Sequence, residues 1–126
     1  MPEIQVVFYR ETDESIPVLD WILTLIPKAQ TKCLARIQRL QQRGHELRRP
    51  EADYLRDDIY ELRVGLQGVN YRILYFFHGR NAAVLAHSIV KERSVPPGDI
   101  NKAIARKHQF EQYPEQHTFS GEIDGI

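Results

Sequence analysis

Three strand-like segments follow one another in the second half of the chain, and they constrain the fold more than any other feature. They are residues 59–64 (IYELRV), 69–78 (VNYRILYFFH) and 82–92 (AAVLAHSIVKE), all rich in β-branched and aromatic side chains. Only short connections that contain glycine separate them. Connections this short join antiparallel neighbours, because a parallel crossover needs a dozen or more residues. The sequence therefore predicts an antiparallel meander.

A strand and two helices are expected before the meander. Residues 3–9 (EIQVVFY) favour a strand. Ser15 is the expected N-cap of a first helix, and Pro27 is expected to end it. Residues 28–43 form an amphipathic pattern with apolar side chains at one face, and Gly44 follows as the expected C-cap. The two helices should pack as a helical hairpin.

The remaining segments complete the predicted order of strand, two helices, three strands and helix. Residues 45–58 are polar and are interpreted as a loop, and Asp99 is expected to cap a final helix that runs to Phe110. This order predicts an α+β domain over residues 1–110. Its antiparallel sheet has about four strands, with the helical hairpin packed on one face and a C-terminal helix. Residues 111–126 are expected to be an acidic tail that is ordered only if it docks.

Composition excludes several classes of protein. The 126 residues suit one domain, and the 17 basic and 17 acidic residues give no net charge. Residues 59–110 nevertheless hold 8 Lys/Arg against 3 Asp/Glu. The only cysteine is Cys33, which suits a reducing cytoplasm, and the histidines show no spacing typical of metal ligands. No apolar run is long enough to span a membrane, so a cytoplasmic protein without metal or other cofactor is expected.

Arginines in the middle of two predicted strands are the main candidates for function. Alternation places Arg63 and Arg72 on the sheet face that the helical hairpin leaves open, and Leu85, His87 and Lys91 are expected to share a face with one another. Two structural alternatives stay open. The arginines could be satisfied ion pairs, for example with Asp57 or Asp58, and His87 could be a hydrogen-bonded core residue.

The motifs YELR (60–63), YRILY (71–75) and HxxxK (87–91) stand in this order before a proline-containing turn and an alanine-rich helix. Over about residues 4–110 the chain resembles the RelE/ParE superfamily of type II toxins, particularly its HigB-like branch. The resemblance implies a RelE-like fold and a toxin that cuts mRNA on the ribosome. It also implies a cognate antitoxin, expected to be of the helix-turn-helix type, that holds the toxin inactive.

The same resemblance implies a reaction without metal, in which a 2′-hydroxyl attacks the adjacent phosphorus and leaves a cyclic phosphate. Such a reaction needs cations at the phosphate oxygens and a group that transfers protons. The implied catalytic residues are Arg72, which would stabilise the transition state, Lys91, and His87, which would transfer a proton. Arg63 and Arg93 are the implied RNA-binding residues. These cations can bind RNA only where internal carboxylates do not neutralise them.

Two other functions remain open from the sequence. A ParE-like toxin would share this scaffold and inhibit DNA gyrase by binding it. An inactive remnant of a toxin would only bind a partner. The neutral total charge favours the remnant, because RNA affinity depends largely on neutralising phosphates.

Overall fold

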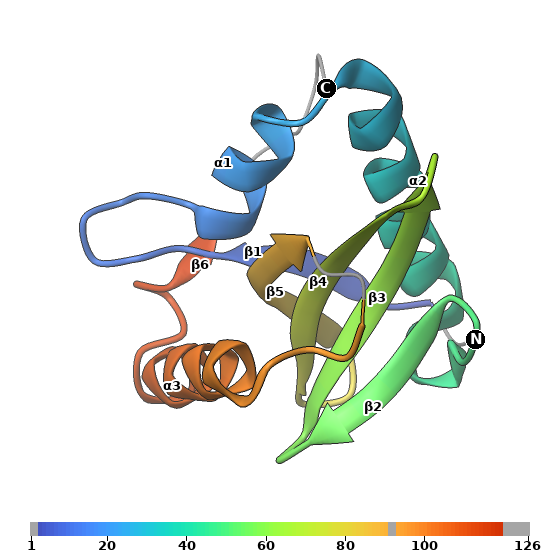
Figure 1. Ribbon diagram of the computed structural model, residues 1–126. Helices are drawn as coiled ribbons and strands as arrows, with labels where there is room; N and C mark the ends of the chain where they lie inside the picture. Colours follow the sequence, from blue (N-terminus) through green and yellow to red (C-terminus); the bar gives the residue numbers. More distant parts are fainter. Residues whose placement is uncertain (1–2, 91–92, 120–126) are drawn as a thin grey trace.

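The computed structural model describes residues 3–90 and 93–119, which form a mixed six-stranded sheet with helices on both faces (Figure 1). The strand order is β2-β3-β4-β5-β1-β6. The predicted α+β class is confirmed. The elements are β1 (Gln5–Tyr9), α1 (Pro17–Leu23), α2 (Pro27–Arg43), a 3-10 turn η1 (Gly44–Glu46), β2 (Ala52–Arg56), β3 (Ile59–Leu66), β4 (Val69–His78), β5 (Ala82–Val90), α3 (Pro97–Gln112) and β6 (Thr118–Phe119).

The predicted meander is confirmed, because β3, β4 and β5 are consecutive antiparallel neighbours. Gln67 and Gly68 alone connect β3 to β4, and both have positive φ, 51° and 81°. Two consecutive residues with positive φ form the type I′ turn, whose twist matches that of a hairpin. Glycine adopts this conformation without a steric penalty.

The prediction of a wholly antiparallel sheet of about four strands is wrong in two respects. Residues 45–58, interpreted as a loop, contain β2, which forms a hairpin with β3 through Asp57 and Asp58. Both aspartates have positive φ, which Asp tolerates better than most residues. This tight turn contains no glycine, so the usual sequence signal for such a turn is missing. The second error concerns β1, which pairs with β5 in parallel.

The helix boundaries follow the prolines. Pro17 and Pro27 stand at the first positions of α1 and α2, where the missing N–H costs nothing. Pro27 therefore begins the second helix, whereas α1 has already ended at Leu23. Ser15 does not cap α1; its hydroxyl donates to Asp13 Oδ1 at 2.7 Å. Gly44 is the C-cap of α2 as predicted, with φ of 54°.

The sheet separates two apolar cores. The face covered by α1 and α2, called the hairpin face below, buries Ile73 and Tyr75 of β4. The opposite face, called the α3 face, buries Leu74 and Phe76 of the same strand against α3. This arrangement confirms the prediction that residues 69–78 lie near the middle of the sheet, because both faces of the strand are apolar.

The segment expected to be an acidic tail begins inside α3, which continues to Gln112. Beyond it, His117 is buried and its ring stacks on Tyr9 with centroids 5.1 Å apart. Thr118 and Phe119 then pair with the end of β1 as β6. Residues 120–126 lie outside the described part of the chain.

Candidate functional site

The α3 face of the sheet brings together three of the predicted site residues. Arg63 of β3 lies directly opposite Arg72 of β4. His87 of β5 lies opposite Leu74, two positions further along β4. Side chains that are opposite or two residues apart share a face, so both arginines and the histidine project toward α3.

A β-bulge in β5 is what aims His87 at this face. The register pairs Tyr75 with Leu85 but Leu74 with His87, so Ala86 is an extra residue in β5. An extra residue shifts the alternation of every side chain after it. The expectation that Leu85 and His87 share a face is therefore wrong, because Leu85 belongs to the core under the hairpin.

A buried glutamate neutralises much of the charge of the two arginines. Glu61 is 2% exposed and lies on the same face as Arg63. Its Oε2 accepts from Arg63 Nε at 3.2 Å and Nη2 at 3.1 Å, and its Oε1 accepts from Arg72 Nη1. Opposed like charges destabilise a strand pair, and this shared carboxylate removes that penalty. The structure supports the alternative of satisfied ion pairs, but Glu61 takes the place of Asp57 or Asp58, and Asp57 pairs with Arg56.

The ion pairs continue toward the sheet edge. Asp53 of β2 accepts from Arg63 Nη2 at 3.1 Å and from Arg49 Nη2 at 2.8 Å. The hydrogen bond from Arg49 is the main cause that holds the pKa of Asp53 below its ordinary value. Three arginines and two carboxylates thus alternate in one network, called the arginine network below: Arg49, Asp53, Arg63, Glu61 and Arg72. It keeps one surplus positive charge.

His87 is held by two residues of α3. Its Nε2 lies 2.8 Å from Asp99 Oδ1, and its Nδ1 lies 3.3 Å from Arg106 Nη1. Because a guanidinium only donates, Nδ1 must accept and Nε2 must carry the proton that Asp99 accepts. Burial is the main cause that lowers the pKa of His87, although the bond to Asp99 opposes it. His87 therefore occupies the position of a hydrogen-bonded core histidine, as the structural alternative expected.

Asp99 occupies another position than predicted. The N-cap of α3 is Pro96, and Asp99 stands in the first turn, where its carboxylate faces His87 and makes no cap. A carboxylate in a first helical turn is also favoured by the helix dipole. The contact fixes the start of α3 to the bulged part of β5.

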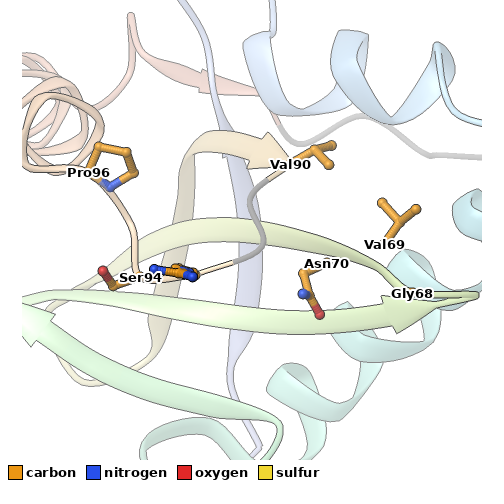
Figure 2. Close-up of a pocket in the computed structure, with 7 residues that line it drawn as sticks. Gly68, Val69, Asn70, Val90, Ser94 and Pro96 are labelled. Carbon is orange, nitrogen blue, oxygen red and sulfur yellow. The ribbon is translucent and has the colours of Figure 1, made fainter.

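Arg93 is an exposed cation in the connection from β5 to α3. It lines an open cavity of about 580 Å³ together with Asn70, Val90 and Ser94 (Figure 2). Figure 2 shows Asn70 and Val69 projecting to opposite sides of β4 at this cavity. Among the described residues, Arg93 has no ion-pair partner. Lys91, predicted as catalytic, lies outside the described residues.

Other chemistries find little support in the parts of the chain that are described. Residues 3–90 and 93–119 contain no group of three His, Cys, Asp or Glu side chains placed to hold a metal ion. No helix in these ranges is long and apolar enough to cross a bilayer. Burial raises the pKa of the Cys33 thiol to about 11, so this residue is a poor nucleophile.

The carboxylates of the site escaped prediction from the sequence. Glu61 stands two residues before Arg63, so the two side chains share a face of the strand. This spacing is the one sequence signal that indicates an ion pair between them. Asp53 could not be found in the same way, because the strand that carries it was interpreted as a loop. Arg106 lies 19 residues from His87, and only the packing of α3 brings the two together.

Comparison with known families identifies the chain. A model of the family described as phage-derived protein Gp49-like (DUF891) matches residues 20–108, which is more than two thirds of the sequence. A search of curated proteins gave no match. The matched region includes both arginines of the sheet, the bulge and the contacts of His87 with α3. The chain therefore belongs to the Gp49-like family of phage-derived proteins, which is part of the RelE/ParE-like toxin superfamily.

Proposed function

We propose that this protein is a HigB-like toxin that cleaves mRNA on the ribosome and is neutralised by an antitoxin. Membership of a family associated with toxin–antitoxin toxins supports an antitoxin partner. Arg72 would stabilise the pentacoordinate phosphate, Lys91 would assist it, and Arg63 and Arg93 would hold the RNA. The reaction uses the 2′-hydroxyl of the RNA as nucleophile and leaves a cyclic phosphate, so it consumes no cofactor.

The surplus positive charge of the arginine network is the observation that carries this proposal. Asp53 and Glu61 compensate two of the three arginines, and Arg63 and Arg72 lie on the α3 face. A guanidinium has five N–H donors, and Glu61 accepts from one nitrogen of Arg72, Nη1. A phosphate oxygen could accept from the remaining N–H donors of Arg72 and would balance the surplus positive charge of the network.

Proton transfer is the step for which His87 must leave its resting contacts. Both ring nitrogens face α3, Nε2 toward Asp99 and Nδ1 toward Arg106. In the proposed reaction, the ring leaves both contacts, and Nδ1, the nitrogen without a proton, turns to the RNA and takes the proton from the 2′-hydroxyl. The lowered pKa of His87 keeps the ring in the neutral form that a base requires.

Mapping of mRNA 5′ ends on ribosomes isolated after expression tests the proposal. The protein should arrest growth and produce new ends inside reading frames. Arg93→Ala should lower cleavage by roughly tenfold, since it removes a phosphate contact from an exposed position without disturbing the fold. Arg80→Ala is the matched control, because Arg80 is an exposed arginine of the β4–β5 turn. Arg72→Ala and Lys91→Ala should abolish cleavage. Growth arrest without new mRNA ends, or cleavage undiminished in Arg72→Ala and Lys91→Ala, contradicts the mechanism.

A second candidate is a protein that binds its partner and cleaves nothing. The ion pairs favour it, because Glu61 binds Arg63 and Arg72 at once and His87 is bonded at both nitrogens. Under this function, expression at a high level leaves growth and mRNA intact. DNA breaks in place of mRNA cleavage would instead indicate a ParE-like action on gyrase.

A further inference from the structure

The β3–β4 turn separates two open cavities that together form an exposed apolar surface. Val69 and Val90 line the first cavity, where they are 37% and 47% exposed. Leu66 and Pro27 line the second, of about 400 Å³. Leu66 and Val69 are cross-strand partners on either side of the turn, so the two cavities adjoin. We call these cavities and the turn between them the tip surface.

Strongly exposed large apolar side chains stand in the first cavity of the tip surface and in the connection that leads to Pro27 of the second cavity. Ile26, which precedes Pro27, is 55% exposed, and Leu23 at the end of α1 is 53% exposed. With Val69 and Val90, these are four of the six large apolar side chains that are strongly exposed in the described residues. A cluster of this kind marks an interaction site, whereas single exposed apolar residues need no explanation.

Cations stand at both ends of this surface. Arg93 lines the first cavity, and Lys28 and Lys32 line the second. Lys32 Nζ also donates to the Gly65 carbonyl at 2.9 Å, which fixes the ammonium beside the turn. Among the described residues that line the two cavities, none is an aspartate or a glutamate. The complementary occupant therefore has apolar side chains in its middle and carboxylates at its two ends.

A protein segment fits this pattern better than RNA does. Non-specific RNA binding combines a basic groove with aromatic rings on which bases stack. The floor of the tip surface is made of the aliphatic side chains Leu66, Val69 and Val90. Such a floor accommodates aliphatic or aromatic side chains of a peptide and offers no ring to a base.

Strand addition at the open edge of the sheet is the competing way for a partner to bind, and β2 disfavours it. Its outward N–H groups are already used inside the protein. Ala52 N–H donates to the Arg48 carbonyl at 3.1 Å, and Tyr54 N–H donates to Asp53 Oδ1 at 3.0 Å. An added strand needs these donors for its own carbonyl groups. Strand addition at this edge therefore finds little support, and the tip surface remains as the candidate site for a partner.

We propose that the tip surface binds a segment of the antitoxin in which apolar side chains are flanked by carboxylates. The inference rests on the proposed function only for the identity of the partner. It places the partner over the β3–β4 turn and in the cavity that Arg93 lines. A bound segment there would also restrict access of RNA to Arg93, which gives the antitoxin a direct means of inhibition.

The test titrates the protein, by calorimetry, with the product of the reading frame adjacent to its gene, which is where the proposed function expects the antitoxin. Val69→Asp should weaken binding at least 100-fold, because it places a charge on the apolar floor and repels the carboxylates. Lys28→Glu should weaken it about tenfold and reduce its dependence on salt. Tyr113→Asp is the matched control, since Tyr113 is 58% exposed and lies outside the tip surface. It should bind like the original protein.

The outcomes that follow contradict the proposal that the tip surface binds the antitoxin. Equal affinity of Val69→Asp and the original protein does so directly, as does the absence of any complex with the antitoxin. Loss of ribosome binding in Lys28→Glu together with intact antitoxin binding would assign the surface to RNA. A homodimer that Val69→Asp dissociates would assign it to a second copy. Growth arrest is measured in parallel. If the protein binds the antitoxin but does not arrest growth, the result contradicts the proposed toxicity and leaves the docking site supported.

Discussion

Arg63 and Arg72 lie directly opposite each other on neighbouring strands, although both are cations. The pair is tolerated because Glu61, buried beside Arg63, binds both guanidinium groups. This relationship explains why arginines stand in the middle of strands that are otherwise apolar. It also means that the charge available to an external anion is the surplus of a network and not the sum of free arginines.

Removal of the shared carboxylate should destabilise the fold strongly. In Glu61→Gln, two opposed arginines lose their common counter-charge, and the expected loss is about 3–5 kcal/mol in the free energy of unfolding. Urea denaturation measures it. Glu46→Gln is the matched control, because Glu46 forms an exposed ion pair with Arg43, 3.8 Å long, and should change stability by less than about 1 kcal/mol. Equal effects of the two variants would show that the buried contact contributes nothing special.

The lowered pKa of His87 predicts that stability falls in mild acid. The unfolded histidine has a pKa near 6.5 and binds a proton more readily than the folded one. Stability is therefore fully present above pH 6.5 and is lost as the pH falls from there toward the folded pKa, by at most about 1.4 kcal/mol per pH unit. His87→Gln should flatten this part of the profile. Urea denaturation at pH 7.5, 6.5 and 5.5 compares the two proteins.

The neighbours of His87 provide an independent control on the same group. Asp99 raises its pKa through a hydrogen bond and its charge, whereas Arg106 lowers it. Asp99→Asn should therefore shift the pKa of His87 further down, and Arg106→Gln should shift it up. NMR titration of the imidazole measures both. Shifts in the opposite directions would mean that the ring does not lie between these two side chains.

The run of β-branched and aromatic residues at positions 69–78 was sufficient to predict β4, because side chains on both faces of this strand are largely apolar. The α2 helix was equally accessible, with one apolar face and Gly44 at its end. The parallel pairing of β1 with β5 was not, because it depends on how two helices and three strands return the chain to the first strand. Local patterns do not contain that information.

The sequence was sufficient to predict that Arg63 and Arg72 share one face of the sheet, but not the charge balance around them. His87 shares the face of Arg63 and Arg72 only because Ala86 is an extra residue in β5, and a bulge with an ordinary alanine leaves no mark in the sequence. The partners of these residues come from β2 and α3, which are distant along the chain. Tertiary packing therefore decides whether an arginine is a free cation or half of an ion pair.

Cys33 should be almost unreactive in the folded protein. Its side chain is completely buried, and burial raises its pKa to about 11. About one thiol in a thousand is then ionised at pH 8, and the thiolate is the reactive form. Reaction with a chromogenic disulfide reagent should be slow in buffer and at least 100-fold faster in denaturing urea. A fast native reaction would mean that α2 separates readily from the sheet.

His117 should attach the segment after α3 to the sheet. Its ring is stacked on Tyr9 at an interplanar angle of 3°, and its Nδ1 donates to the Arg10 carbonyl at 2.8 Å. The loss of one aromatic contact and one buried hydrogen bond in His117→Ala should cost about 2 kcal/mol in the free energy of unfolding. His108→Ala is the matched control, because His108 is exposed on α3 and should leave stability within about 0.5 kcal/mol. Urea denaturation of both variants under the same conditions measures the difference. If His117→Ala is as stable as His108→Ala, residues 113–119 contribute nothing to the fold, and the pairing of β6 with β1 is too weak to order this segment.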